Sequence, residues 1–294
     1  MKSLHLIINP NAGTRQARRF LPEIITVFNR AGFFCSVYVT EKRGDATRFV
    51  QKYAGGTDLV VACGGDGTLN EVITGLQLGG HAVPLGYIPC GSTNDFANGL
   101  GLPTAPLLAC ESIASGTPHT LDLGFFSPDR YFTYTASFGA FTSVSWSTPQ
   151  NVKNILGHIA YILEGIRSLA DIRPIHMKIT ADGRQLEDDY IFGAVCNSTS
   201  LGGVLKLKDS QVHMNDGLFE ALLIPFPPDL LALNRILAAL RAQNYEDPTL
   251  LFLRASAFTF ESVPHIMWTL DGESAEAGSV TKVRNLRDAI RIQY

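Results

Sequence analysis

The sequence lacks a basic excess, a cysteine cluster and a long apolar run. Its 294 residues carry a formal net charge of −3, whereas proteins that bind duplex nucleic acid usually show a clear basic excess, so we expect no nucleic-acid partner. Charged residues make up only 17%, below the roughly 25% of an average soluble domain. This value agrees equally with a large packed core and with a surface that carries extra apolar area.

The few cysteines are widely spaced. They form no CxxC pair and have no histidine cluster beside them, which argues against a structural zinc site and against a disulfide framework. Their pattern predicts a reducing cytoplasm. The first apolar run breaks at Asn9 and Pro10, and no stretch approaches the roughly 18 apolar residues of a membrane span. We therefore expect neither a signal peptide nor a transmembrane segment.

The first part of the chain alternates strand-like and helix-like segments. Repeated β-then-α units predict a parallel sheet covered by helices on both faces, and ligands of such sheets bind beyond the carboxyl ends of the strands. We assign this α/β domain to residues 1–125. Its expected strands are Leu4–Ile8, Phe34–Val39, Asp58–Ala62 and Val83–Ile88, and its expected helices are Arg15–Arg30, Asp45–Tyr53, Leu69–Leu78 and Asn94–Leu100.

The remainder, residues 126–294, reads as a mainly antiparallel, β-sandwich-like domain with inserted helices, and its last segment could return to pack on the first domain. The Asp182–Gly183 pair between two β-like runs is a strong hairpin signal. The expected strands are Tyr131–Phe138, Pro174–Thr180, Gln185–Asn197, Leu218–Ile224, Leu251–Phe260, Ile266–Leu270 and Ala289–Ile292, and the expected helices are Asn151–Ala170 and Leu230–Arg241.

A glycine-rich block, GGDGTLNEV at residues 64–72, directly follows the third expected strand. Its glycines let backbone N–H groups approach a ligand, and Thr68 can cap a following helix whose N-terminus favours phosphate. Asp66 would repel phosphate directly, so it suits a role at Mg²⁺ or in orienting a basic side chain. A strand-to-helix turn that needs glycine only for its geometry is the alternative, and the block as a whole favours the phosphate site.

Three shorter elements offer further polar groups. In NPNAG, residues 9–13, the asparagines can bind a nucleotide or stabilise an Asx-type turn. In GSTN, residues 91–94, N–H and hydroxyl groups precede a helix, and Asp95 can serve a metal or complement the helix dipole. In the DGE element, Asp271 and Glu273 flank Gly272, so both carboxylates can face one cleft, although a hairpin turn explains the same residues.

Together these elements resemble the catalytic domain of the bacterial diacylglycerol kinase family, which sphingosine and ceramide kinases share. GGDGTLNEVITGL is similar to its nucleotide-binding signature, NPNAG to its first element, IPCGSTNDFA to its PxGTxNDFA block and LDGE to its late element. Ser92 departs mildly, since the family often has Thr there, and Thr93 lies beside it. NAD kinases and phosphofructokinases carry only a shorter GGDG element.

The resemblance implies a set of roles. Asp271 would be the general base for a lipid hydroxyl, and Mg²⁺ would offset the repulsion between the acidic side chains and the triphosphate of ATP. The implied nucleotide-binding residues are Asn9, Thr40, Gly64, Gly65, Asp66, Gly67, Thr68, Asn70, Glu71, Gly91, Ser92, Thr93 and Glu273, and the implied acidic network is Asp66, Asp95, Asp122 and Glu273.

A separate loop resembles one that holds Mg²⁺ in the second domain of the family. The implied ligands are the Asp216 carboxylate and the backbone carbonyls of His213 and Leu218. Carboxylate and carbonyl oxygens suit this ion. An ordinary Asp-Gly turn is the alternative.

By this resemblance we expect a phosphotransferase that moves the γ-phosphate of ATP to the alcohol group of a membrane lipid, diacylglycerol first, within phospholipid biosynthesis. The enzyme would be cytoplasmic and peripheral at the inner face of the membrane, and a homodimer stays open. The alternatives are a kinase similar to NAD kinase and a catalytically inactive lipid- or nucleotide-sensing module.

Overall fold

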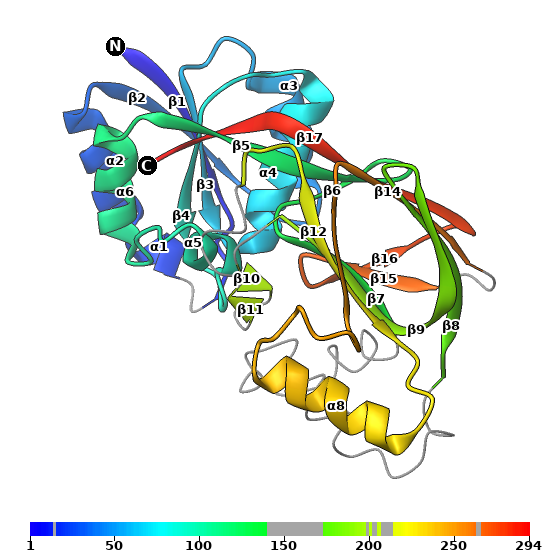
Figure 1. The fold of residues 1–294 in the computed structure, drawn as a ribbon. Coiled ribbons are helices and arrows are strands. Elements are labelled where there is room, and N and C mark those ends of the chain that lie inside the picture. The colour runs from blue at the N-terminus through cyan, green and yellow to red at the C-terminus, as the bar shows by residue number, and fades with distance from the viewer. Residues whose placement is uncertain (14–15, 140–172, 198–199, 202–204, 207–213, 263–265) are drawn as a thin grey trace. The chain divides into compact units, whose positions relative to one another are not determined.

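The structure is a computed structural model, and it describes residues 1–13, 16–139, 173–197, 200–201, 205–206, 214–262 and 266–294. The expected helix Asn151–Ala170 and the carbonyl of His213 lie outside the described residues. The chain forms two compact units (Figure 1), which are described separately. Unit 1 consists of Met1–Asp122 with Asp288–Tyr294, and unit 2 consists of Leu123–Arg287.

Unit 1 contains a parallel sheet in the order β2-β1-β3-β4-β17. The four strands β1 to β4 are rich in apolar residues, as expected for strands covered on both faces, and β3 and β4 are buried at every position. Only the carboxyl end of strand β17 joins this sheet, where Ile292 pairs with Leu85. The strands are β1 (Lys2–Ile8), β2 (Phe33–Val39), β3 (Leu59–Gly64), β4 (Leu85–Pro89) and β17 (Val280–Gln293).

Helices cover both faces of this sheet (Figure 1). Ile24 and Phe28 of α2 and Ala109 and Ile113 of α6 share one core with alternate residues of β1 and β3. Helices α3 and α4 pack together on the other face. The helices are α1 (Gln16–Arg19), α2 (Leu21–Arg30), α3 (Asp45–Tyr53), α4 (Asp66–Gly79), α5 (Asp95–Gly99) and α6 (Pro106–Ser115). The predicted parallel α/β architecture is therefore confirmed.

Unit 2 is mainly antiparallel. Its strands follow the order β16-β15-β7-β9-β8-β14-β17, and β12 pairs with both β9 and β13. The strands are β6 (Arg130–Phe132), β7 (Thr135–Gly139), β8 (Ile175–Ala181), β9 (Arg184–Cys196), β10 (Ser200–Leu201), β11 (Leu205–Lys206), β12 (Phe219–Pro225), β13 (Leu251–Ala255), β14 (Ala257–Ser262), β15 (Met267–Leu270) and β16 (Glu273–Glu276), and β5 (Pro118–Phe126) runs in from unit 1.

The predicted hairpin between β8 and β9 is present. Asp182 and Gly183 have φ angles of 43° and 91°, the left-handed backbone that a tight two-residue hairpin turn requires. Helix α8 (Leu230–Arg241) has the predicted bounds and begins after Asp229, whose carboxylate accepts a hydrogen bond from the Ala232 N–H at 2.7 Å. Leu233, Leu237 and Leu240, which we call the leucine stripe of α8, lie in the core of unit 2, while Leu230 and Leu231 stay exposed.

Three expected elements are each broken in two. The helix expected over Arg15–Arg30 divides into α1 and α2, because Pro22 cannot donate the N–H that a continuous helix needs. The strand expected over Leu251–Phe260 divides at Ser256, whose N–H and hydroxyl donate to the Asp182 carboxylate. The strand expected over Tyr131–Phe138 divides between β6 and β7, where the N–H groups of Thr133 and Tyr134 donate to the Asp271 carboxylate.

Among the described residues, no helix has the length and apolarity needed to cross a bilayer.

Candidate functional site

The carboxyl ends of the strands of unit 1 carry the loops that the sequence singled out. NPNAG follows β1, Thr40 follows β2, the GGDG block begins at the end of β3, and GSTN follows β4. Because the strands are parallel and adjacent, their loops emerge at one edge of the sheet, where α/β proteins bind ligands.

Three of these loops approach one another so closely that glycine is required. A Cβ on Gly91 would lie 2.6 Å from the Gly65 Cα, and one on Gly65 would lie 3.2 Å from the Gly91 Cα. Gly13 has a φ of +49°, and a Cβ there would lie 2.4 Å from the Cys90 carbonyl oxygen. We call this meeting of Gly13, Gly65 and Gly91 the glycine cradle. Gly13 is exposed and Gly65 and Gly91 are half-buried, so backbone without side chains reaches the surface here.

Asp66 joins two of the loops. It is the first residue of α4, and its carboxylate accepts hydrogen bonds from the N–H groups of Asp95 (3.1 Å) and Phe96 (3.2 Å) and from the Thr93 hydroxyl (3.3 Å). Burial raises the pKa of Asp66, and these hydrogen bonds lower it in part. The carboxylate is thus fixed in place with an incompletely compensated charge.

Thr68 does not cap the helix as expected. Helix α4 begins at Asp66, with Gly65 as the N-cap residue and no side-chain cap, so Thr68 lies inside the first turn. Its hydroxyl instead accepts a hydrogen bond from the Asn9 side-chain amide at 3.1 Å, while the Asn9 Oδ1 accepts one from the Asn11 N–H at 3.0 Å. Asn9 therefore forms the Asx-type turn and also ties the first loop to α4.

The GSTN loop is shaped by Asn94, which was not among the predicted site residues. Asn94 adopts a φ of 52°, and its Oδ1 accepts the Gly91 N–H at 2.8 Å. Ser92 and Thr93 are exposed at the tip, and Asp95 begins α5. An asparagine three residues after a glycine, just before a helix, was the available signal, since asparagine tolerates left-handed backbone.

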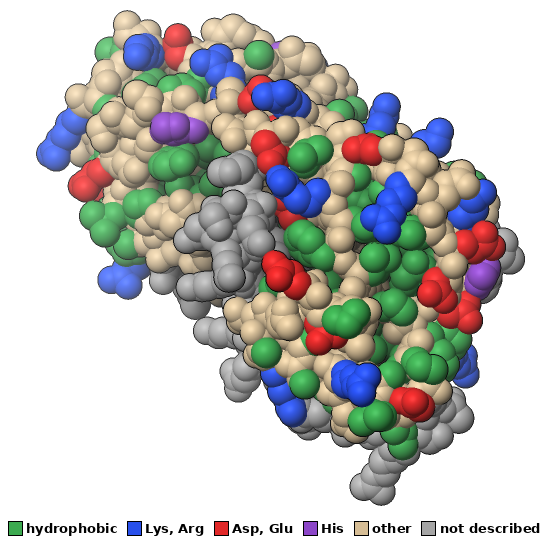
Figure 2. Space-filling view, in the orientation of Figure 1, with side chains coloured by type: hydrophobic (Ala, Val, Ile, Leu, Met, Phe, Trp, Pro, Cys, Tyr) green, Lys and Arg blue, Asp and Glu red, His purple; other side chains and the backbone are tan. Residues whose placement is uncertain are grey.

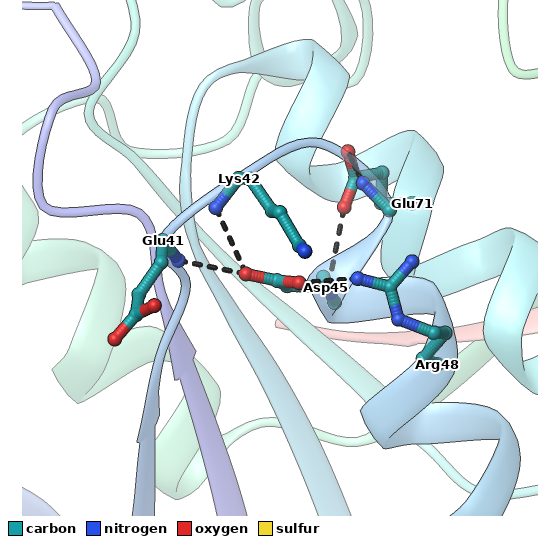
Figure 3. A network of polar contacts seen from close by, with 7 residues as sticks. Glu41, Lys42, Asp45, Arg48 and Glu71 are labelled. Atoms are coloured by element: carbon teal, nitrogen blue, oxygen red, sulfur yellow. Dashed lines mark hydrogen bonds and ion pairs between the residues drawn. The ribbon is translucent and has the colours of Figure 1, made fainter.

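Glu71 and Thr40 make contacts with the backbone. The Glu71 carboxylate accepts the N–H groups of Gly44 (2.8 Å) and Ala46 (3.3 Å) at the start of α3 (Figure 3). Asp45 beside it accepts the N–H groups of Glu41 and Lys42 and pairs with Arg48 (Figure 3). The Thr40 hydroxyl donates to the Ile8 carbonyl at 3.2 Å.

The other predicted residues of unit 1 lie on α4 and β5. A Cβ on Gly64 would collide with Thr68, Gly67 is exposed in the first turn of α4, and Asn70 accepts a weak 3.5 Å hydrogen bond from Thr74. Asp122 is buried in β5, where its Oδ1 accepts the Asp288 N–H at 2.9 Å. Direct contacts thus join Asn9 to Thr68, and Asp66 to Thr93 and Asp95. Asp122 is instead bonded to Asp288, near the end of the chain.

In unit 2, Asp271 occupies a nest of hydrogen-bond donors. One oxygen accepts the Thr133 N–H (2.6 Å) and hydroxyl (2.9 Å), and the other accepts the N–H groups of Tyr134 (3.0 Å) and Thr135 (3.1 Å). Burial raises the pKa of Asp271 to about 6, against these four hydrogen bonds, which lower it. Asp271 and Gly272 form the turn between β15 and β16, and Glu273 begins β16.

The Asp216 loop, which we define as Asp216–Leu218, is held by protein groups. Asp216 Oδ1 accepts the Leu218 N–H at 2.9 Å, and its Oδ2 lies 2.7 Å from the Arg254 guanidinium. Arg254 also pairs at 3.0 Å with Glu220, whose pKa burial raises to about 7. The Leu218 carbonyl accepts the Asn285 amide at 3.2 Å.

This donor set does not suit a metal ion as it stands. A cation at Asp216 would lie beside the guanidinium that is already bonded to Oδ2, and like charges at that distance repel. Within the described part of the chain, no cluster of three or more His, Cys, Asp or Glu side chains could hold a metal.

Comparisons with known proteins cover nearly the whole chain. Residues 3–126 match the family described as diacylglycerol kinase catalytic domain, and residues 137–292 match the YegS C-terminal NAD kinase beta sandwich-like domain. The diacylglycerol kinase of Bacillus subtilis (strain 168) is 32% identical over 276 residues, which are 93% of this chain and 90% of that protein. The diacylglycerol kinase of Staphylococcus aureus (strain MRSA252) is 32% identical over 274 residues, 92% of this chain and 86% of that one.

A solved structure has the same fold. The crystal structure of a Bacillus anthracis str. Sterne protein, described as a candidate diacylglycerol kinase, aligns with a TM-score of 0.82 and 26% identity over 100% of this chain and 95% of that one.

Proposed function

This chain belongs to the diacylglycerol kinase family, as its motifs indicated, and from this premise we propose that it transfers the γ-phosphate of ATP to the hydroxyl of a membrane lipid. Relatives 32% identical over most of the chain are named diacylglycerol kinase, so diacylglycerol, giving phosphatidic acid, is the proposed substrate. The observation that carries the proposal is the glycine cradle, which offers backbone without side chains at the ligand-binding edge of the sheet.

The phosphates of ATP would bind at the cradle. Backbone N–H groups in the first turn of α4 have no partner within the helix and lie at the positive end of its dipole, which favours an anion. The hydroxyls of Ser92 and Thr93 are exposed beside this turn. We assign the remaining nucleotide contacts to Asn9, Thr40, Gly64, Gly67, Thr68, Asn70 and Glu273, with Asp122 completing the acidic network.

The carboxylates of unit 1 fit a magnesium ion that arrives with ATP. Asp66 has a raised pKa because it is buried, so a nearby cation would stabilise its charge, and Asp95 adds a second carboxylate. Magnesium would supply charge neutralisation for the triphosphate. The protein's own part is to hold Asp66 in place through Thr93, Asp95 and Phe96.

In unit 2 we propose Asp271 as the acceptor of the hydroxyl proton. The lipid oxygen would attack the γ-phosphorus, the bond from that phosphorus to the bridging oxygen of ADP would break, and the proton would pass to a carboxylate oxygen of Asp271. Its four hydrogen bonds fix the carboxylate, and a pKa of about 6 is closer to neutrality than that of an ordinary aspartate. Phosphoryl transfer asks mainly for such positioning.

The lipid would be reached from the cytoplasmic side by reversible contact with the membrane surface. Basic side chains are the proposed attachment, because the leucine stripe of α8 is used in the core. In the view of Figure 2, Lys and Arg side chains lie scattered among Asp and Glu side chains. We therefore expect this contact to be weak.

A radiolabel assay tests the proposal. The purified protein is incubated with γ-labelled ATP, Mg²⁺ and, in separate reactions, diacylglycerol micelles, a sphingoid base, a polyprenol and NAD. We expect label in the organic phase with diacylglycerol. Label on NAD would support the NAD kinase alternative, and no transfer to any acceptor despite tight ATP binding would support a sensing module.

A further inference from the structure

The Asp216 loop is bonded to a cationic side chain, the guanidinium of Arg254 on β13. We infer that the Arg254 guanidinium supplies, in this chain, the positive charge that a divalent metal would supply to the loop, so that the loop is held in place without metal. This inference concerns unit 2 alone and does not depend on which acceptor is phosphorylated.

The pairing of β12 with β13 places the arginine. In the antiparallel register Glu220 lies directly opposite Arg254, and the Arg254 Nε donates to Glu220 Oε1 at 3.0 Å. From the same guanidinium, Nη2 donates to Asp216 Oδ2 at 2.7 Å. One planar group with donors in several directions therefore bridges two carboxylates, a task for which a lysine ammonium is less suited.

The burial of Glu220 makes this bridge necessary. Its side chain is only 2% exposed, and a carboxylate removed from water is costly unless a charged partner lies beside it. Arg254 is 40% exposed, so its remaining N–H groups can reach water while its Nε serves the buried partner. A metal at Asp216 Oδ2 would compete with the guanidinium, and displacement of Arg254 would leave Glu220 without its partner.

The other atoms of the loop are also engaged by protein groups. Asp216 Oδ1 accepts the Leu218 N–H, which closes the turn, and the Leu218 carbonyl accepts the Asn285 amide at 3.2 Å. These are the carboxylate and the described carbonyl to which a metal would bind. Their hydrogen bonds, together with Arg254, fix the loop to β13 and to β17, where Asn285 lies.

Thermal unfolding of the full chain without nucleotide tests the inference. We expect the Tm of the wild type to be the same in EDTA and in millimolar Mg²⁺. Arg254→Gln removes the charge and should lower the Tm in EDTA by roughly 10 °C, since a buried carboxylate loses its partner. Magnesium should then restore part of this loss, because the Asp216 loop becomes open to a cation.

Three controls make the result specific. Arg184→Gln replaces an exposed arginine of β9 and should leave the Tm unchanged in both buffers. In the double variant Arg254→Gln with Asp216→Asn the magnesium effect should disappear, which separates this loop from any magnesium bound in unit 1. Arg254→Lys keeps a charge and should stay independent of magnesium, which gives a folded variant if Arg254→Gln does not fold.

Two results would overturn the inference. The first is a wild-type Tm that rises by several degrees with Mg²⁺ and loses this rise in Asp216→Asn, which would show a resident metal beside Arg254. The second is an Arg254→Gln protein that keeps the wild-type Tm in EDTA. A kinase assay is not needed for either result, so failure here and failure of the proposed activity are distinguishable.

Discussion

The Asp66 carboxylate accepts a hydrogen bond from the Phe96 backbone N–H at 3.2 Å, and so links the first turn of α4 to the first turn of α5. The Asp95 N–H donates to the same carboxylate at 3.1 Å. Asp66 therefore acts as a cap for α5 from another helix, and the GGDG and GSTN loops are fixed to each other. A side chain expected to serve a metal also sets the shape of the cradle.

This dual contact predicts the effect of Asp66→Asn. The amide keeps one acceptor oxygen but turns its NH₂ toward N–H donors, so we expect a loss of about 1–3 kcal/mol in the free energy of unfolding. Activity should fall at least a hundredfold as well. Asp58→Asn is the matched control, because Asp58 accepts the N–H and hydroxyl of Ser3 at the amino end of β3. The control should lose stability and keep its kcat, and equal activity losses in both variants would contradict a specific role of Asp66.

Substitution of Gly65 tests the cradle. Its φ is −91°, so backbone strain does not limit a side chain there, but a Cβ would be crowded by the Gly91 Cα at 3.2 Å. Gly65→Ala should weaken ATP binding, and Gly65→Asp, which adds charge as well as bulk, should abolish it while the protein stays folded. Calorimetry with ATP measures both. Gly278→Ala is the control, since its Cβ would meet nothing nearer than 3.9 Å. If Gly65→Asp bound ATP as tightly as the wild type, the cradle would not be the phosphate site.

Glu71 offers a third test, because both of its carboxylate oxygens accept backbone N–H groups at the start of α3 (Figure 3). Glu71→Gln should release this turn and the Thr40 loop before it, with a stability loss of about 1–2 kcal/mol and a higher KM for ATP. Glu23→Gln, at an exposed position of α2, should change neither quantity. Amide exchange of Gly44 and Ala46 that is no faster in the variant than in the wild type would show that the Glu71 contact does not hold the turn.

Much of unit 1 could be predicted because buried parallel strands read as apolar runs that end at glycine, proline or asparagine. Helix α3 has its predicted bounds, and β1 to β4 differ from prediction by a few residues at their ends. Helix α6 was missed, since its apolar residues Leu107, Leu108, Cys110 and Ile113 leave no clear polar face to give a helical period. Strand β16 was missed because ESAE has no apolar alternation and is a strand through its pairing with β15.

The site residues could be identified by type but not by contact. The four hydrogen-bond donors to Asp271 belong to Thr133–Thr135, 136 to 138 positions earlier in the chain. No local sequence pattern predicts this pairing. Arg254 is 38 positions from Asp216, and only the register of β12 and β13 brings it to Glu220. Long-range pairing in antiparallel sheets is set by the whole fold, so sequence motifs cannot reveal such partners.

A fourth prediction concerns the membrane. With the α8 leucine stripe buried, attraction between basic side chains and anionic lipids is the proposed contact, at about 1 kcal/mol for each Lys or Arg near the surface. Binding to anionic vesicles should therefore be weak and should fall as salt rises, with little binding to neutral vesicles. Co-sedimentation across a salt series measures this. Equal binding to both vesicle types at every salt concentration would rule out electrostatic attachment.

Asp271 gives the sharpest test, because stability and activity should respond to pH in opposite directions. Its pKa in the folded protein is raised to about 6 from an ordinary value near 4. A raised carboxyl pKa means that the fold favours the protonated form, so this contribution to stability is fully present below about pH 4 and is lost as pH rises through about 6. The proposed base must be ionised, so kcat should rise through the same range.

Asp271→Asn separates the two effects. The variant should show a large loss of kcat, and its kcat should not fall as the pH drops through about 6. ATP binding should be nearly unchanged, because the glycine cradle, the proposed nucleotide site, lies in unit 1. Subtracting its stability–pH curve from that of the wild type isolates the Asp271 contribution from those of Asp66 and Glu220, whose pKa values are also raised. The amide also faces four donors, so circular dichroism must first show that the variant is folded. Near-normal turnover in a folded Asp271→Asn protein would leave Asp271 with the structural task of holding Thr133–Thr135, and the hydroxyl proton would need another acceptor.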